Sequence, residues 1–196
     1  MEKDIFESGH YYHIYNRGNN KENIFIEEKN YNYFLEKMKK YLLPIADVNA
    51  YCLLKNHFHI VLKIKDQKEL PGKFKEKIHL PFSNFFNSYA KSINTAYNRT
   101  GSLFQEHLRR NRIENEEYLK QLIVYVHLNP VKHKFTESFE TYLHSSYHSY
   151  MSNKETSIDR DFIFELFGGL EDFKFYHDER RLVYKGVIDA IDKMDE

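Results

Sequence analysis

Two β-rich segments separated by only two polar residues place the strongest constraint on the fold of this chain. Residues Ile45–Leu54 and His57–Ile64 are rich in apolar and β-forming side chains, and Lys55-Asn56 interrupts them. A break of two residues between such runs is typical of an antiparallel hairpin. The rest of the chain therefore has to supply the other strands of an antiparallel sheet and the helices that cover it.

The remaining segments predict an α+β protein. His10–Arg17 alternates, is rich in β-forming residues and ends at Gly18, so it predicts a strand, and Ser102–Ile113 can form another. Apolar residues at helical spacing predict helices at Glu27–Leu43, from Pro81 to about Asn98, and at Glu114–Leu128. We expect the last of these helices to end at Asn129, because the residue before a proline is pushed out of the α region.

The order of these segments is strand, helix, strand, strand, helix, strand, helix. It predicts a ferredoxin-like (RRM-like) fold, in which an antiparallel β-sheet has helices packed on one face, plus a short C-terminal helical tail. We place one domain at residues 1–150 and treat residues 151–196 as an acidic helical tail, not an independent domain. This layout leaves one face of the sheet for ligands.

The length and composition narrow the class of protein. The chain has 196 residues, enough for one domain with a sizeable core. Its single cysteine, Cys52, excludes an intramolecular disulfide and a cysteine-based zinc site. No apolar run is long enough to span a bilayer and the N-terminus lacks a signal-peptide pattern, so we expect a cytoplasmic protein without a membrane partner.

The formal net charge is zero, but the charges are unevenly distributed. Lys154–Glu196 contains seven basic and twelve acidic residues, a net of −5, and the remaining 22 basic and 17 acidic residues leave +5 on residues 1–153. A mildly basic body with an acidic tail is compatible with a nucleic-acid partner.

His57 and His59 lie one residue apart at the start of the second hairpin strand. Alternate residues of a strand point to the same face, so the two imidazoles share a face while Phe58 and Ile60 point to the other. Such a pair is either a metal clamp or two polar side chains on a solvated strand face. The pair alone does not decide between these two interpretations.

Tyr125 and Asn129 are four residues apart in the last main helix and therefore lie on one side of it. Tyr125 is either a core tyrosine whose hydroxyl finds a partner or a covalent nucleophile. Two histidine nitrogens and the Asn129 amide oxygen, with open positions for a phosphate substrate, suit Mg²⁺ or Mn²⁺. An ion bound there polarises a phosphoryl oxygen and withdraws charge from the leaving 3′ oxygen.

Several motifs in this order resemble those of the REP-associated tyrosine transposases, single-tyrosine members of the HUH single-strand DNA endonucleases. They are HIYNRGNN (His13–Asn20), AYCLLKNHFHIVLKI (Ala50–Ile64), GSLFQEHLRR (Gly101–Arg110), YVHLNPVK (Tyr125–Lys132) and SSY (Ser145–Tyr147). The resemblance runs from about Tyr12 to at least Tyr150, and the tail segment Leu166–His177 is also similar. The run Leu53-Leu54-Lys55-Asn56 departs from the family, whose members often have Met-Pro-Asn there.

The resemblance implies a metal-dependent endonuclease and strand transferase that acts on single-stranded or hairpin-containing DNA. Tyr125 would attack a phosphodiester, forming a 5′-phosphotyrosine link and freeing a 3′-OH that can later re-attack. His57 and His59 would hold the divalent cation, Mg²⁺ or Mn²⁺, and Asn129 would be the third ligand. Catalysis within one chain and catalysis across a homodimer both stay open. His127 and the other histidines are expected to be structural or exposed.

The predicted DNA contacts are polar and basic residues near the strand ends. They are Asn16, Arg17, Asn19, Gln105, Arg109, Arg110 and Arg112. Arginine suits bidentate contacts to phosphate or guanine, although the same residues could form an ordinary solvated face. The alternative function is a non-catalytic RRM-like protein that binds single-stranded nucleic acid, but the basic-glycine-aromatic RNP signature does not occur in the sequence.

Overall fold

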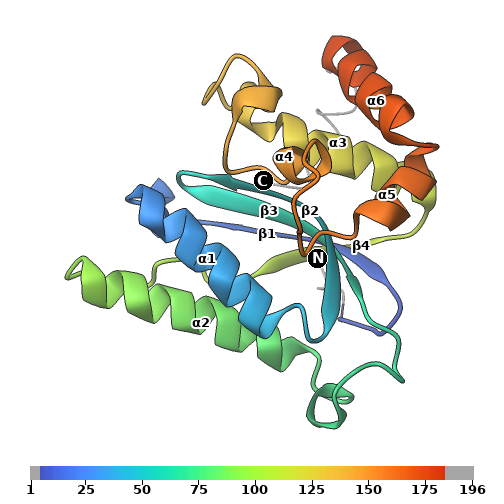
Figure 1. Ribbon diagram of the computed structural model, residues 1–196. Coiled ribbons are helices and arrows are strands. Elements are labelled where there is room, and N and C mark those ends of the chain that lie inside the picture. Colours follow the sequence, from blue (N-terminus) through green and yellow to red (C-terminus); the bar gives the residue numbers. More distant parts are fainter. Residues whose placement is uncertain (1–4, 184–196) are drawn as a thin grey trace.

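The predicted hairpin forms half of a four-stranded antiparallel sheet (Figure 1). The structure, a computed structural model, describes residues 5–183. The strands are β1 (Tyr11–Arg17), β2 (Ala46–Leu54), β3 (His57–Ile64) and β4 (Arg109–Ile113). Their spatial order is β2-β3-β1-β4, which together with the intervening helices is the predicted ferredoxin-like arrangement.

The strand bounds agree with the prediction in the hairpin and differ from it in β4. Leu54 and His57 are paired across the hairpin, with Lys55-Asn56 as the turn. The predicted strand Ser102–Ile113 is shortened to β4, because residues 106–108 interrupt its pairing with β1, although residues 103–105 bond to the end of β1 and the residues that follow it. There the backbone amide of Gln105 donates to the backbone carbonyl of Arg17 at 2.9 Å.

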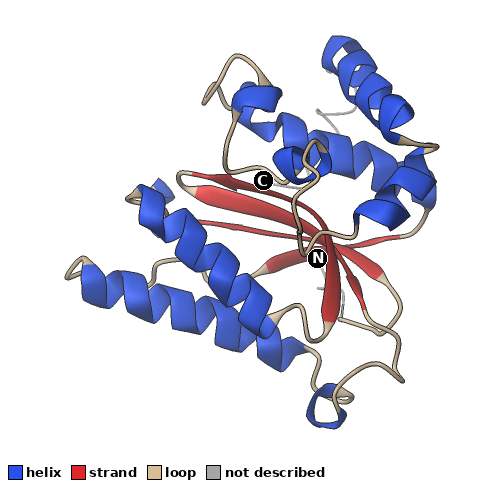
Figure 2. Cartoon of the chain, viewed as in Figure 1, coloured by secondary structure: helices blue, strands red, loops and turns tan. Residues whose placement is uncertain are grey.

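Helices cover both faces of the sheet (Figure 2). They are α1 (Glu28–Tyr41), α2 (His79–Ala96), α3 (Glu116–Lys132), α4 (Tyr147–Tyr150), α5 (Arg160–Phe167) and α6 (Leu170–Val183). α1 and α2 pack on one face, where the rings of Phe34 and Phe86 each lie 5.3 Å from the ring of Phe58. α3 to α6 lie on the other face, so the prediction of helices on one face only is wrong. The face that an RRM-type protein leaves open is covered here.

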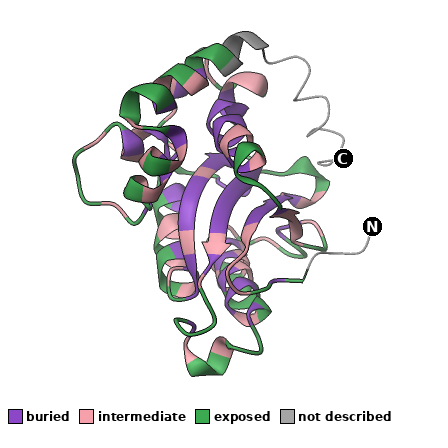
Figure 3. Cartoon of the chain, turned by 90° about the vertical axis from the view of Figure 1, so that its right-hand side faces the viewer, coloured by how far each residue is buried: buried purple, intermediate pink, exposed green. Residues whose placement is uncertain are grey.

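The reason for the second layer is the composition of α3. Every residue from Leu122 to Pro130 is buried, so the helix is covered on all sides in this stretch. A helix that is buried all round has to lie between two layers. Here those layers are the sheet and the C-terminal helices, and Figure 3 shows the strands buried between the outer, exposed sides of the helices.

α3 continues through Pro130, although the sequence predicts it to end at Asn129. Proline lacks an amide hydrogen, so one helical hydrogen bond is lost at this position. The helix still closes with a bond of 3.0 Å from the His133 amide to the Asn129 carbonyl. Burial of the surrounding side chains outweighs the loss of one bond in the last turn. The continuation keeps Asn129 one turn after Tyr125 on the same side of α3.

The C-terminal helices are held to α3 by a buried chain of polar groups. His127 Nδ1 lies 2.8 Å from His177 Nε2, and His127 Nε2 lies 2.8 Å from the Ser146 hydroxyl. His177 Nδ1 in turn lies 2.7 Å from the Phe173 carbonyl. His127 is therefore structural, as expected. The division into a domain and a tail stays a prediction, and residues 184–196 of that tail lie outside the described residues.

The Phe173 carbonyl fixes the tautomer of His177 in this chain. A carbonyl can only accept, so His177 Nδ1 donates to it, and neutral His177 then accepts at Nε2 from Nδ1 of His127. Neutral His127, with its proton on Nδ1, then accepts at Nε2 from the Ser146 hydroxyl, whose other acceptor is the Tyr51 carbonyl at 3.3 Å. Protonation of either ring would bury a charge away from water, and the Ser146 hydroxyl would then have to donate to the Tyr51 carbonyl instead. Burial therefore favours the network in which both histidines are neutral.

No helix within residues 5–183 has the length and apolar character needed to cross a membrane. The expected cytoplasmic location stays a prediction.

The buried histidine chain predicts a loss of stability in mild acid. Burial lowers the pKa of His177 to about 4 and that of His127 well below its usual range, whereas both titrate near 6.5 when unfolded. Between pH 6.5 and pH 4 the unfolded state therefore binds more protons, and stability falls as pH falls. Each such histidine contributes about 1.4 kcal/mol per pH unit in this window.

The measurement is the free energy of unfolding in urea at pH 7 and pH 5. His177→Leu is expected to be less stable than the wild type at pH 7, and to lose roughly 2 kcal/mol less between the two pH values. An equal loss in both proteins would contradict the assignment of His177 as a neutral, buried member of the network.

Candidate active site

His57 and His59 share one face of β3, and this face is covered by α3. Their side chains are only 6% and 3% exposed. On the neighbouring strand β1 they are paired with Arg17 and Tyr15, respectively, so an arginine and an aromatic ring flank them. The two imidazoles thus do not lie on a solvated strand face, which was one of the two interpretations of this motif.

Burial keeps the histidines of this region neutral. It lowers the pKa of His57 to about 3, and the nearby His133 and Arg17 add to the shift. It also lowers the pKa of His59 well below the usual value, and that of His133 to about 4. A neutral imidazole keeps a nitrogen lone pair, which is the form that binds a metal ion.

Two buried atoms of this region, His57 Nε2 and the Asn129 amide oxygen, can serve as metal ligands. His57 Nε2 and both amide atoms of Asn129 have no hydrogen-bond partner. The Asn129 side chain is close enough to His57 to favour its charged form, yet no well-formed hydrogen bond joins the two. Unpartnered imidazole nitrogen and amide oxygen are suitable ligands for a divalent cation. The residues present therefore fit the predicted metal.

The protein alone would not complete this site. Within residues 5–183, no three histidine, cysteine or acidic side chains are grouped so that they could hold a metal ion. An ion bound by His57, His59 and Asn129 would take its remaining ligands from water or from a phosphate substrate. Such open positions are typical of catalytic Mg²⁺ sites.

Tyr125 lies beside the two histidines. Its ring centroid is 5.7 Å from that of His59, with the two rings edge to face. The Lys132 ammonium lies 5.2 Å from the Tyr125 ring centroid. Tyr125 is only 3% exposed, but it adjoins the solvent-accessible region through His59 and Lys132. The predicted nucleophile and the predicted metal ligands are thus brought together by α3 and β3.

A cavity of about 210 Å³ opens at the two histidines. Its walls are formed by Tyr15, Asn16, Arg17, His57, Phe58, His59, Gln105, Arg109, Lys132 and His133. Among the described residues that line the cavity, three are cationic and none carries a carboxylate. The cavity therefore suits an anionic group such as a phosphate.

Four of the predicted DNA-binding residues meet in this cavity: Asn16, Arg17, Gln105 and Arg109. Asn16 is also a structural link, because its side-chain nitrogen donates to the Gln105 carbonyl at 3.2 Å. Asn19 lies next to them in the chain but does not line the cavity. Its backbone amide donates to the Leu103 carbonyl at 3.0 Å.

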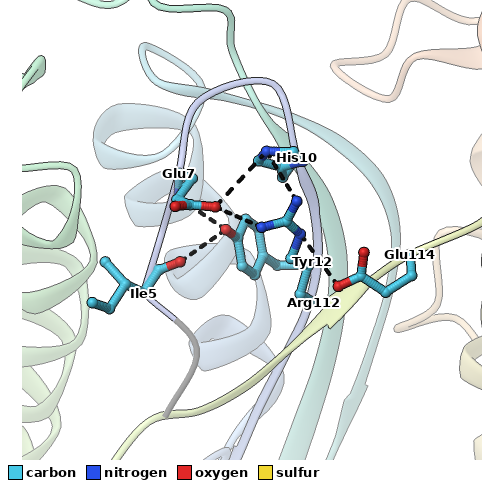
Figure 4. A network of polar contacts seen from close by, with 6 residues as sticks. All are labelled: Ile5, Glu7, His10, Tyr12, Arg112 and Glu114. Atoms are coloured by element: carbon cyan, nitrogen blue, oxygen red, sulfur yellow. Dashed lines mark hydrogen bonds and ion pairs between the residues drawn. The ribbon is translucent and has the colours of Figure 1, made fainter.

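The other two predicted contacts lie away from the histidines. β4 sends Arg110 and Arg112 to the opposite face from Arg109, and the Arg110 guanidinium lies 4.9 Å from the ring of Phe6. Arg112 contacts the carboxylates of Glu7 and Glu114 (Figure 4). The structure therefore gives these two arginines no common surface with the predicted metal ligands.

Sequence analysis missed four residues of this region: His13, Tyr15, Lys132 and His133. Lys132 lies seven residues after Tyr125, two helical turns along α3, so the helical spacing could have identified it. His13 and Tyr15 reach the histidines only through the pairing of β1 with β3. The strand order and register that bring them there are not evident from the sequence.

Comparisons with known proteins support the fold. No family model matches the sequence, and neither does any curated protein. A solved structure of a REP-associated tyrosine transposase bound to a REP hairpin is similar, with a TM-score of 0.57 over 78% of this chain and 85% of that one, at 16% sequence identity. This chain has the fold of that transposase. The structural relationship agrees with the resemblance of the motifs.

Gly18 holds the cavity wall in position. Its amide donates to the Asn56 carbonyl in the hairpin turn at 2.8 Å, and Gly18 forms a bridge with Phe104. A Cβ atom here would lie 1.9 Å from the Glu22 carbonyl oxygen, a backbone atom that cannot move aside cheaply. Gly18 follows Arg17 and lies against the segment that carries Gln105, and this position therefore requires glycine.

Gly18→Ala is expected to destabilise the protein by roughly 1–3 kcal/mol, the usual cost of forcing an extra group into a packed site. Gly72→Ala is the matched control, because a Cβ atom at Gly72 has no neighbour within 4 Å. Urea unfolding of the two variants measures the difference. If both variants match the wild type, the backbone around Gly18 is not tightly packed.

Proposed function

We propose that the chain is a metal-dependent single-strand DNA endonuclease and strand transferase that works through a 5′-phosphotyrosine intermediate. The observation that carries the proposal is the meeting of Tyr125, His59 and the unpartnered polar atoms of His57 and Asn129 beside a cationic cavity. The similar transposase is bound to a REP hairpin, which supports single-stranded or hairpin DNA as the partner of this chain.

His57, His59 and Asn129 would hold a divalent cation, Mg²⁺ or Mn²⁺. When bound, this ion supplies Lewis acidity that stabilises the charge on a phosphoryl oxygen and on the leaving 3′ oxygen. The histidines contribute neutral nitrogens, since burial keeps them unprotonated. The Asn129 side chain contributes its oxygen.

Tyr125 would perform the covalent step. Its phenolic oxygen attacks the phosphorus, a Tyr–O–P bond forms, and the bond between phosphorus and the 3′ oxygen breaks. The phenolic proton is released to solvent, and the departing 3′ oxygen takes up a proton to become a 3′-OH. Later attack by a 3′-OH on the phosphotyrosine reverses the bonding and joins strands.

The cations in the cavity would bind the phosphate. Arg17, Arg109 and Lys132 all line the cavity, and arginine can contact two phosphate oxygens at once. Lys132 also lies over the Tyr125 ring, which places a cation next to the proposed nucleophile. Arg110 and Arg112 lie on the opposite face of β4 and would at most contact a distant part of the DNA strand.

Tyr125→Phe is expected to abolish the covalent protein–DNA adduct while leaving DNA binding intact, because it removes only the attacking oxygen. The measurement uses a single strand with a hairpin, and the adduct is detected on a denaturing gel. Tyr15→Phe is the matched control, because Tyr15 is the other tyrosine beside His59, with ring centroids 5.8 Å apart. An adduct lost in Tyr15→Phe and kept in Tyr125→Phe would make Tyr15 the nucleophile.

Cleavage is expected to stop in excess chelator and to return with Mg²⁺ or Mn²⁺. His57→Ala and His59→Ala should each abolish it, and Asn129→Ala should weaken Mn²⁺ binding, because each removes a ligand. His133→Ala is the control, since His133 lines the cavity but is not a proposed ligand. Undiminished cleavage in chelator would rule out the metal. Tight RNA binding with no adduct on DNA or RNA would favour the RRM-like binding protein instead.

A further inference from the structure

A second histidine lies directly behind His59. His13, on β1, is 1% exposed and has its Nε2 atom 2.9 Å from Nδ1 of His59. His59 lines the cavity and His13 does not. His13 therefore contacts the ring nitrogen of His59 that points away from the cavity. Only Nε2 of His59 remains for a ligand on the cavity side.

The hydrogen bond between the two rings holds one proton between His13 Nε2 and His59 Nδ1. Either ring can be the donor, so two arrangements are possible. In the first, His59 carries the proton on Nδ1 and donates it, so that its Nε2 atom has a free lone pair. In the second, His13 donates from Nε2, and neutral His59 then carries its own proton on Nε2. Only the first arrangement leaves a nitrogen of His59 that can bind a metal ion.

We propose that His13 is a positioning residue that holds His59 in the tautomer able to bind a divalent cation. This inference rests on the proposed metal site. A histidine ligand commonly donates its other ring N–H to a partner that fixes its tautomer and orientation, and losing such a partner typically weakens metal binding by 10–100-fold. His13 supplies that partner from the neighbouring strand.

The surroundings of the pair restrict its motion. The Tyr15 ring stacks on both imidazoles, with centroids 4.7 Å from His13 and 5.8 Å from His59. Tyr15 is itself paired with His59 across β1 and β3. The two imidazoles are therefore held nearly parallel, 17° apart, in a geometry set by the sheet.

The test measures Mn²⁺ affinity by electron paramagnetic resonance, without DNA and without turnover. His13→Leu removes both ring nitrogens at similar volume and is expected to weaken Mn²⁺ binding by about 10–100-fold. His13→Gln keeps an acceptor near the position of Nε2 and is expected to bind Mn²⁺ close to the wild-type level. His177→Leu is the matched control, because it removes the other buried histidine–histidine bond, on the far side of α3, and should leave Mn²⁺ affinity unchanged.

Nitrogen-15 NMR of the His59 ring in the metal-free wild type gives a second readout that needs no variant to fold. We expect the proton on Nδ1, and a wild-type ring with the proton on Nε2 would overturn the proposal. Unchanged Mn²⁺ affinity in His13→Leu would also overturn the proposal, provided that His59→Ala has lost Mn²⁺ binding. If His59→Ala binds Mn²⁺ like the wild type, it is the proposed metal site that fails, and the role of His13 fails with it.

Discussion

The packing of α3 against the β2–β3 hairpin is the interaction on which the rest of this structure depends. A ferredoxin-like sheet with only α1 and α2 would leave His57 and His59 facing water. α3 covers this face, makes the histidines neutral and sets Tyr125 edge-on against His59. The opposite side of the same helix is covered by α5 and α6, and His127 links α3 to α6. One helix therefore joins the site to the C-terminal part of the fold.

The sequence predicts local features of this arrangement well, because they depend on near neighbours. The hairpin bounds follow from β-forming residues on either side of a two-residue turn, and the shared face of His57 and His59 follows from strand alternation. The position of Tyr125 and Asn129 on the same side of α3 follows from helical spacing. The end of α3 was predicted wrongly because the rule for residues before proline is local, whereas the burial of Leu122–Pro130 is a tertiary effect.

What could not be predicted depends on how distant segments pair. The His13–His59 contact requires β1 to lie beside β3 with Tyr15 opposite His59, and a shift of one residue would send His13 to the other face. The separation of Arg109 from Arg110 and Arg112 follows from alternation along β4, but which of them meets the cavity depends on how β4 pairs with β1. The second helical layer was missed because the sequence suggests two-layer packing, and only the full burial of α3 demands a third.

The local charge of the cavity differs from that of the whole chain. The formal net charge of the protein is zero, yet the cavity walls carry Arg17, Arg109 and Lys132 and no carboxylate among the described residues. Histidines add no charge there, because burial keeps them neutral. Positive charge thus comes from arginine and lysine side chains, and lone pairs come from the neutral histidines. A phosphate and a cation could therefore be bound side by side, each by a different set of residues.

His127 and Asn129 are two polar residues buried on the same helix, and they differ in one respect. Both ring nitrogens of His127 have hydrogen-bond partners, whereas neither amide atom of Asn129 has one, and His57 Nε2 beside it also has none. Leaving a buried polar group unpaired costs about 1–3 kcal/mol, and a leucine in place of Asn129 would avoid that cost. A position that only stabilised the fold would not favour asparagine. The bonded histidine is explained by packing alone, while the unbonded asparagine supports the proposal that Asn129 is a metal ligand.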